Sequence, residues 1–256
     1  MTTTVNLKGL VRYEGTHFRG WQVQPDGRTV QGELERCLSQ IAGEAIRIVG
    51  ASRTDAGVHA LGQVFSFRWP EHKPFERLAR ALSCMLSPEI RVVSIEKAED
   101  DFHARFSAKW KRYAYALVLQ RETDPFLARY AWFVRCDVDM GLLTRLAQQL
   151  VGTHDFAGFQ SAGSPSSTTV RTVRSISVKP GYVVGPQDIQ HAWYIEIEGD
   201  GFLYHMVRNI VGTLIEICSG KRPESWLHER LQSGGPFVGL TAPAHGLFLV
   251  GVYYEG

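Results

Sequence analysis

The sequence has few cysteines, and no arrangement of them suggests a metal site or a disulfide framework. The four cysteines, at positions 37, 84, 136 and 218, lie far apart and form no Cys-x-x-Cys pair. The histidines are isolated as well, with no His-x-x-x-His spacing. Metal sites need several such ligands at short spacing. We therefore expect no bound metal, and thiols that stay reduced, as in a cytoplasmic protein.

Long apolar runs and a strong net charge are also missing. No stretch of about 18 consecutive apolar residues occurs, which argues against a membrane-spanning helix. The first residues, Met-Thr-Thr-Thr-Val, lack the basic and apolar segments of a signal peptide. Lys and Arg number 28 against 26 Asp and Glu, and the net charge of +2 is too small to indicate nucleic-acid binding by itself.

Common nucleotide-binding and hydrolase motifs are absent. The sequence contains no Gly-x-x-x-x-Gly-Lys-Ser/Thr loop, no Gly-x-Gly-x-x-Gly after a strand and no Gly-x-Ser-x-Gly. Such motifs bind phosphates at the start of a helix or carry a serine nucleophile. We therefore expect no nucleotide cofactor. Hydrophobic residues make up 44% of the 256 residues, which predicts a folded core rather than disorder.

Apolar periodicity predicts the same order of elements in both halves of the chain. Residues 1–105 give strands and helices in the ferredoxin-like order β-α-β-β-α-β, at 5–13, 29–42, 46–51, 62–67, 76–85 and 90–96. Residues 106–256 give strands at 109–119, 170–179, 191–198 and 247–254, with helices at 139–151, 203–219 and 223–232. The sequence thus predicts an α+β protein of two ferredoxin-like halves, with their sheets joined and a central cleft.

One stretch, residues 50–63, concentrates polar side chains between two predicted strands and reads GASRTDAGVHALGQ. It holds Arg53, Asp55 and His59, and Gly57 is able to take a positive φ. Loops carried by rigid strands often hold catalytic groups, but Asp-x-Gly is also ordinary turn chemistry. The pattern predicts a sharp, non-hairpin turn with Asp55 near its apex. Spacing alone leaves a catalytic and a purely structural role equally open.

Two further stretches combine rings with polar groups. The predicted loop 14–26 contains Phe18 and Trp21, on which bases could stack, although both rings are equally suited to anchoring the loop. The strongly apolar predicted helix 203–219 carries Arg208. A buried arginine needs a carboxylate partner, for which Asp55 is the candidate; an arginine at the exposed edge of the helix is the alternative.

The segment Arg53-Thr54-Asp55-Ala56-Gly57-Val58-His59-Ala60 resembles the signature of the TruA-type tRNA pseudouridine synthases. The resemblance covers nearly the whole chain in the family's order, at residues 13–15, 18–22, 30–31, 101–107, 112–115, 155–156, 171–173, 202–212 and 246–250. There are two departures. Ser52 stands where many members have Gly, and the loop 160–169 has no Lys or Arg.

The resemblance implies an enzyme that isomerises uridine to pseudouridine at nucleotides 38–40 of tRNA, in the anticodon stem-loop. The family's catalytic residues fall on Asp55, Tyr113 and Arg208. Residues expected to bind the substrate are Tyr113, Arg53, His59 and Arg105. The resemblance also implies a cytoplasmic homodimer that needs neither metal nor cofactor, in which each tRNA touches both subunits. Residues 1–105 would carry the Asp55 loop, and residues 106–256 would carry Tyr113 and Arg208.

The residue types suit this reaction. Isomerisation breaks the N1–C1′ bond, turns the uracil and joins C5 to C1′. Cleavage develops positive charge on the sugar, which an ionised Asp55 stabilises or captures. The target nucleotide must leave the stack, at a cost of a few kcal/mol. Tyr113 would stack on the flipped uracil and help to remove the C5 proton.

Two other classes of function remain open. A non-catalytic RNA-binding module is disfavoured by the joint presence of Asp55, Tyr113 and Arg208. A glycosidase acting on a small nucleoside would lack a second carboxylate in the key loop. Release of tritium from C5-labelled uracil in tRNA distinguishes the isomerase from the binding module. Activity on free uridine but not on tRNA would indicate the glycosidase.

Overall fold

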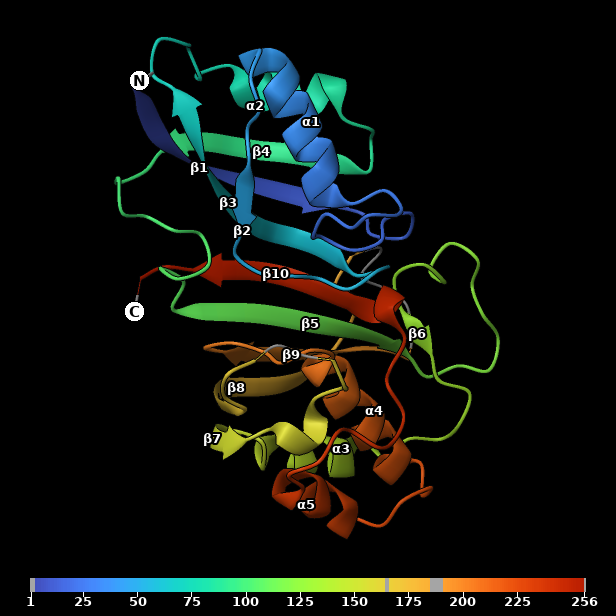
Figure 1. The fold of residues 1–256 in the computed structure, drawn as a ribbon. Helices are drawn as coiled ribbons and strands as arrows, with labels where there is room; N and C mark the ends of the chain where they lie inside the picture. Colours follow the sequence, from blue (N-terminus) through green and yellow to red (C-terminus); the bar gives the residue numbers. More distant parts are fainter. Residues whose placement is uncertain (1–2, 164–165, 185–190, 256) are drawn as a thin grey trace. The chain divides into compact units, whose positions relative to one another are not determined.

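The computed structural model describes residues 3–163, 166–184 and 191–255. Positions 164 and 165 of the loop 160–169 therefore lie outside the described residues, as does part of the connection that follows residue 180. The chain forms two compact units. The first is Met1–Lys109 together with Leu249–Gly256, and the second is Trp110–Phe248. Both units combine strands with helices, so the protein is α+β as predicted (Figure 1).

The first unit has the predicted ferredoxin-like order. β1 (Thr4–Tyr13) lies between β3 (His59–Pro70) and β4 (Ile90–Lys97) and pairs antiparallel with both. β2 (Ile48–Gly50) pairs antiparallel with β3, so that β3 separates the two strands that helix α1 connects. β10 (Leu247–Tyr253) also neighbours β3, and its residues from Leu249 onward belong to this unit.

The two helices of the first unit begin and end close to their predicted positions. At the start of α1 (Val30–Ala42), the Thr29 hydroxyl accepts a hydrogen bond from Gly32 N and so caps the helix. Gly43 ends α1 at a φ of 72° and donates its N–H to Ser39 O. α2 (Leu78–Met85) contacts α1 and packs against β4 (Figure 1).

The connection between β2 and β3 corrects one prediction. These consecutive strands are antiparallel partners, with Gly50 opposite Phe65, so residues 51–58 form a long hairpin loop rather than a non-hairpin turn. The prediction failed because the loop has none of the short turn sequences that reveal a hairpin. β3 also extends back to His59, farther than the predicted 62–67, so its pairing with β1 determines where the loop ends.

The second unit repeats the arrangement in which a third strand lies between two strands that a helix connects. β5 (Trp110–Val118) pairs antiparallel with β9 (Ala192–Gly199), and β9 pairs antiparallel with β8 (Val170–Pro180). β9 thus lies between β5 and β8 as β3 lies between β1 and β2. Two short strands were not predicted, because periodicity needs more residues than they contain. They are β6 (Trp132–Phe133), parallel to β5, and β7 (Gly152–Asp155), antiparallel to β8.

The helices of the second unit are α3 (Met140–Gln148), α4 (Met206–Cys218) and α5 (Ser225–Gln232). α4 contacts α3, α5 and strand β5 (Figure 1), and eleven of its thirteen residues are buried. The strongly apolar composition of α4 follows from this enclosure. Gly220, two residues after the end of α4, has a φ of 74°, which a glycine adopts without strain. Among the described residues, no helix is both long and apolar enough to cross a membrane.

Candidate active site residues in the two units

The polar loop, defined here as residues 51–58, carries Arg53 and Asp55 in the first unit. Arg53 is exposed, whereas Asp55 is half-buried. Val58 N donates a hydrogen bond to Asp55 O at 3.2 Å, which closes a turn that begins at Asp55. Gly57 lies within this turn at a φ of 79°, so its predicted positive φ is confirmed.

The base of the polar loop is held by Gln63, a fully buried side chain on β3. Gln63 Nε2 donates to Ser52 O at 2.6 Å, and Gln63 Oε1 accepts from Ser52 N at 3.2 Å. One amide therefore satisfies both backbone groups of Ser52, as a neighbouring strand would. This contact fixes the loop three residues before Asp55.

The aromatic loop, defined here as residues 14–27, supports the other side of the polar loop. Trp21 N donates to Thr54 O at 3.1 Å, and Gly57 N donates to Phe18 O at 3.4 Å. The hydroxyls of Tyr13 and Thr54 are 2.7 Å apart. The rings of Phe18 and Trp21 are 3% and 2% exposed, so they anchor the loop to the core and are not available to stack on bases.

His59 lies at the start of β3 with 2% of its surface exposed. Its Nδ1 accepts a hydrogen bond from Gly15 N at 2.9 Å, so this nitrogen carries no proton. The approach of Glu14 Oε1 to the same nitrogen, at 3.4 Å, is therefore not a charged hydrogen bond. A Cβ on Gly15 would lie 2.0 Å from Val58 O, so only glycine fits between His59 and the polar loop. The predicted contact of His59 with the substrate stays a prediction.

Tyr113 belongs to the second unit, where it lies on β5 opposite Ile197 and is 5% exposed. Its ring and the ring of Phe202 pack edge to face, with centroids 5.2 Å apart. Tyr115 follows on the same face of β5 and donates its hydroxyl to Pro243 O at 2.7 Å. Burial raises the pKa of Tyr115 well above its usual value, so its hydroxyl keeps its proton.

Arg208 lies in the first turn of α4 and is half-buried. Its Nε donates to Ala242 O at 2.7 Å, and Ala242 N donates to Arg208 O at 3.1 Å. The chain around residues 240–242 also approaches the next turn of α4, where a Cβ on Gly212 would lie 1.6 Å from Leu240 O. Arg208 is thus fixed by contacts of its side chain and of its backbone to one segment.

Asn209, next to Arg208, is fully buried and connects three segments of the second unit. Its Nδ2 donates to Phe159 O at 2.8 Å and lies 3.1 Å from Ser161 Oγ, while its Oδ1 accepts from Thr241 Oγ1 at 2.7 Å. Ser161 Oγ is also 3.1 Å from Nδ1 of His205, which precedes α4 at a φ of 61°. Buried amides satisfied in this way specify one arrangement of their neighbours.

No role for Gln63 or for Asn209 was predicted from the sequence. A polar side chain within an apolar run is the one signal that marks both positions. Of the predicted site residues, Arg53, Asp55, His59 and Arg105 belong to the first unit, and Tyr113 and Arg208 to the second. Within residues 3–163, 166–184 and 191–255, no group of three or more His, Cys, Asp or Glu side chains is arranged to hold a metal ion.

Known proteins resemble this one over nearly the whole chain. A relative named tRNA pseudouridine synthase A from Thermoanaerobacter sp. is 39% identical over 250 residues, which is 97% of this chain and 99% of that protein. Relatives of the same name from Geobacillus sp. and Latilactobacillus sakei are 41% and 40% identical, over 97% and 98% of this chain and 98% and 100% of their own. A chain of a solved Cbf5-Nop10-Gar1 complex matches 81% of this chain and 53% of its own at 9% identity, but its TM-score of 0.37 is too low to support an argument.

The match to a family model includes both units. The model is described as tRNA pseudouridine synthase, and it matches residues 10–107 and 146–255. These ranges contain the polar loop with Asp55 and the start of α4 with Arg208, the two regions that buried amides hold in place. This match and the identity to full-length relatives show that the chain belongs to the tRNA pseudouridine synthase family.

Proposed function

We propose that this protein isomerises uridine to pseudouridine in the anticodon stem-loop of tRNA, at nucleotides 38–40, with Asp55 as the catalytic carboxylate. One observation supports this most strongly: about 40% identity to relatives named tRNA pseudouridine synthase A extends over nearly the whole of both chains. The polar loop adds a physical reason, because Asp55 is half-buried in a turn fixed from two sides. A catalytic carboxylate benefits from such pre-organisation.

The reaction conserves all atoms of the nucleotide. The N1–C1′ bond breaks, and its electron pair leaves with the uracil while positive charge develops at C1′. Asp55 stabilises or captures this charged sugar, as carboxylates do in glycosidic bond cleavage. The uracil turns and forms a bond from C5 to C1′. The proton then leaves C5, and N1 gains a proton.

Tyr113 and Arg208 complete the proposed catalytic set. Tyr113 stacks on the flipped uracil and assists the loss of the C5 proton. Arg208 supplies positive charge that balances Asp55 and the negative charge on the departing uracil. The short bond from Arg208 Nε to Ala242 O supports a positioned guanidinium, because it restricts a long side chain. Arg53, His59 and Arg105 are assigned to binding of the tRNA, the first and last through their exposed cationic groups.

We further propose that the protein acts as a homodimer in the cytoplasm, with each tRNA touching both subunits. Light scattering on purified protein, with and without an anticodon stem-loop RNA, measures the molecular mass of the protein particle and so tests the dimer. If the protein has the mass of a single subunit at concentrations that give full activity, the dimer is contradicted. The proposed isomerase activity would be unaffected by that result.

The decisive experiment measures tritium release from tRNA that carries C5-labelled uracil. Wild type is expected to release tritium from tRNA but not from free uridine, and Asp55→Asn is expected to release none above background. Asp137→Asn, which changes an exposed aspartate elsewhere in the chain, is the matched control and should retain full release. Full release by Asp55→Asn would refute the role of this carboxylate. RNA binding by wild type without release would favour the binding module instead.

Tyr113→Phe separates stacking from proton transfer. The variant keeps the ring and loses the hydroxyl, so RNA affinity should remain normal while turnover falls. Single-turnover tritium release, measured at saturating tRNA, reports this step without interference from binding. Normal turnover would remove the hydroxyl from the mechanism.

A further inference from the structure

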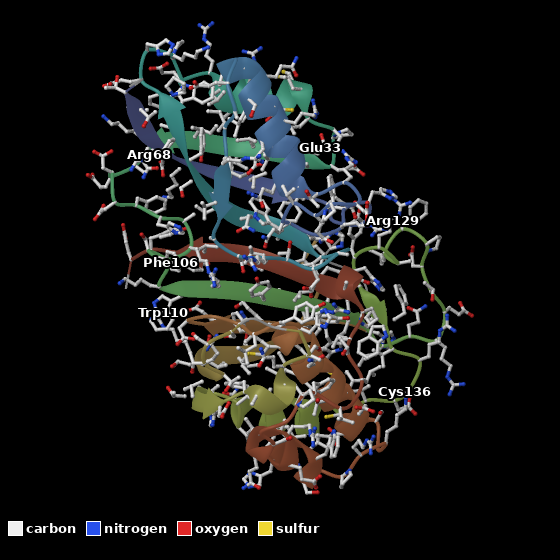
Figure 2. All side chains as sticks on the ribbon, in the orientation of Figure 1. Glu33, Arg68, Phe106, Trp110, Arg129 and Cys136 are labelled. Carbon is white, nitrogen blue, oxygen red and sulfur yellow. The ribbon has the colours of Figure 1, made fainter. Side chains whose placement is uncertain are left out.

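The turn after β4, residues 103–107, presents the ring of Phe106 to solvent. Phe106 is 76% exposed and is labelled in Figure 2. A single exposed apolar side chain is common on protein surfaces and says little by itself. What distinguishes Phe106 is how rigidly the turn beneath it is built.

Hydrogen bonds to His103 lock the turn. The ring nitrogen Nδ1 of His103 accepts from Arg105 N and from Phe106 N, both at 3.2 Å. His103 N donates to Ser107 Oγ at 3.1 Å, and Ser107 N donates to His103 O at 2.9 Å. Four hydrogen bonds within five residues leave this short segment little conformational freedom.

Ala104 fixes the same turn to the core of the first unit. It has no exposed surface and packs with Ala51 and Val64. Its N–H donates to Ser66 Oγ at 3.1 Å, and its carbonyl accepts from the Tyr254 hydroxyl at 2.8 Å. The turn is therefore attached to both β3 and the segment after β10, and it cannot fold inward to bury Phe106.

Phe106 is already stacked on one side. The rings of His103 and Phe106 have centroids 4.3 Å apart and an interplanar angle of 30°. The Arg105 guanidinium carbon lies 5.5 Å from the Phe106 centroid. An aromatic ring held in one orientation binds a planar partner without the entropy cost of ordering itself.

We propose that Phe106 is a stacking platform for an unpaired base of the tRNA, and that Arg105 binds a phosphate of the same strand. This inference rests on the proposed function, because it deepens how the substrate is held. Exposed aromatic rings beside arginines are how proteins hold single-stranded RNA. The loops of a tRNA supply unpaired bases that can reach such a ring.

The surroundings of Phe106 favour RNA over a protein partner. Protein interfaces bury a contiguous apolar core, whereas the exposed side chains in and next to this turn include Arg105 and Asp101. The acidic charge nearby is partly offset, since Asp100 pairs with Arg68 at 3.2 Å. An exposed ring beside a guanidinium matches one base and one phosphate.

Phe126 supplies the matched control. It is 85% exposed in the second unit, so its exposure equals or exceeds that of Phe106. Its backbone N–H is bonded to Asp124 Oδ1 at 2.8 Å, and within the described part of the chain no aromatic ring stacks on it. If exposure alone created RNA affinity, replacing either phenylalanine would weaken RNA binding. The stacking platform predicts that only the replacement of Phe106 does so.

The test measures the Kd for an anticodon stem-loop RNA by fluorescence anisotropy. Phe106→Ala and Phe106→Leu are expected to raise Kd about 10-fold, as loss of one stacked base does. Phe106→Trp keeps an aromatic face and should restore Kd to within about 2-fold of wild type. Phe126→Ala should leave Kd unchanged. Equal Kd values for wild type and Phe106→Ala would overturn the proposal.

Further measurements separate the platform from other roles. Because Phe106 is exposed, its variants should keep the melting temperature of the wild type. The salt dependence of binding should be unchanged in Phe106→Ala, whereas Arg105→Ala should reduce the slope of log K against log salt by about 1. A halved molecular mass of Phe106→Ala by light scattering, with Kd unaffected, would mean that the ring contacts a second copy. These binding results hold or fail whether or not wild type releases tritium, so they are independent of the proposed chemistry.

Discussion

The polar loop of the first unit and the start of α4 in the second unit both hold a candidate site residue in position, but they do so through different contacts. Asp55 lies on an irregular connection, and groups outside the loop hold it, including Gln63 and the backbone of Trp21. Arg208 lies on a regular helix, where its own side chain and its neighbour Asn209 make the contacts. The loop therefore has several separate supports, whereas the helix start depends on one connected set.

This difference has a consequence for mutations. Supports that act separately can be removed one at a time, each with a limited loss. A connected network loses several partners when one member is removed, and orphaned buried groups are costly. We therefore expect substitutions around Arg208 to lower the free energy of unfolding more than matched substitutions around Asp55. Four experiments follow, from the largest expected effect to the smallest.

The largest expected loss of stability comes from adding a methyl group to either of two glycines that lie close to a backbone carbonyl. A Cβ at Gly212 would lie 1.6 Å from Leu240 O, and a Cβ at Gly15 would lie 2.0 Å from Val58 O. Overpacking typically costs about 1–3 kcal/mol, and we expect Gly212→Ala to exceed this range because a buried helix cannot shift. Gly15→Ala should fall within it, since a loop can yield. Urea unfolding measures both, with Gly234→Ala, where a Cβ meets nothing within 4 Å, as control.

Substitution of the two buried amides comes next. Asn209→Ala leaves Phe159 O and Thr241 Oγ1 without their partner, which should lower the free energy of unfolding by about 2–4 kcal/mol. Gln63→Ala leaves only the backbone of half-buried Ser52, and a loss of about 1–2 kcal/mol is expected. Chemical unfolding at neutral pH gives both values. A larger loss for Gln63→Ala would reverse the proposed contrast.

The hydroxyl pair of Tyr13 and Thr54 gives a smaller effect. Removing their 2.7 Å hydrogen bond, by Tyr13→Phe or by Thr54→Val, should cost about 1 kcal/mol. The two changes act on one bond, so the double variant should lose clearly less than the sum of the single variants. A double-mutant cycle from urea unfolding measures this coupling. Strict additivity would show that the hydroxyls do not support the polar loop together.

The smallest effect is a pH dependence beside Arg208. Burial lowers the pKa of His245 below its usual 6.5; a hydrogen bond with the backbone of Ala131 opposes this shift, and the charge of Arg208 adds to it. His245 is therefore neutral in the folded protein at pH 7, and its contribution to stability is complete above pH 6.5. As pH falls below that value the unfolded state takes up the proton first, so stability declines. Melting temperatures of wild type and His245→Gln from pH 7.5 to about 5 should converge toward low pH.

The sequence predicted the regular part of the fold well, for a physical reason. In β1 and α1 the apolar side chains repeat with the period of the element, because one face packs on the core. β6 and β7 escaped prediction since two and four residues show no period. The hairpin pairing of β2 with β3 escaped it because the connecting loop, residues 51–58, has none of the short turn sequences that indicate a hairpin.

The candidate site was predictable only in part. The polar cluster around Asp55 is local in sequence, as is the need for a positive φ at Gly57, so both are visible without a structure. The roles of Gln63 and Asn209 are not, because each depends on a partner that only folding brings near. Asn209 bonds to Phe159, 50 residues earlier in the chain. The exposure of Phe106 is similarly invisible, since the sequence does not show whether an isolated phenylalanine packs inward or faces solvent.

The membership of residues 249–256 in the first unit sets an order of events during synthesis. Tyr254, which holds Ala104 beneath the Phe106 turn, leaves the ribosome only after the entire second unit has been made. Until then a nascent chain contains Asp55, but the sheet of the first unit still lacks the residues of β10 from Leu249 onward. The first unit begins to be translated first, but it receives its final residues only after the second unit has been translated.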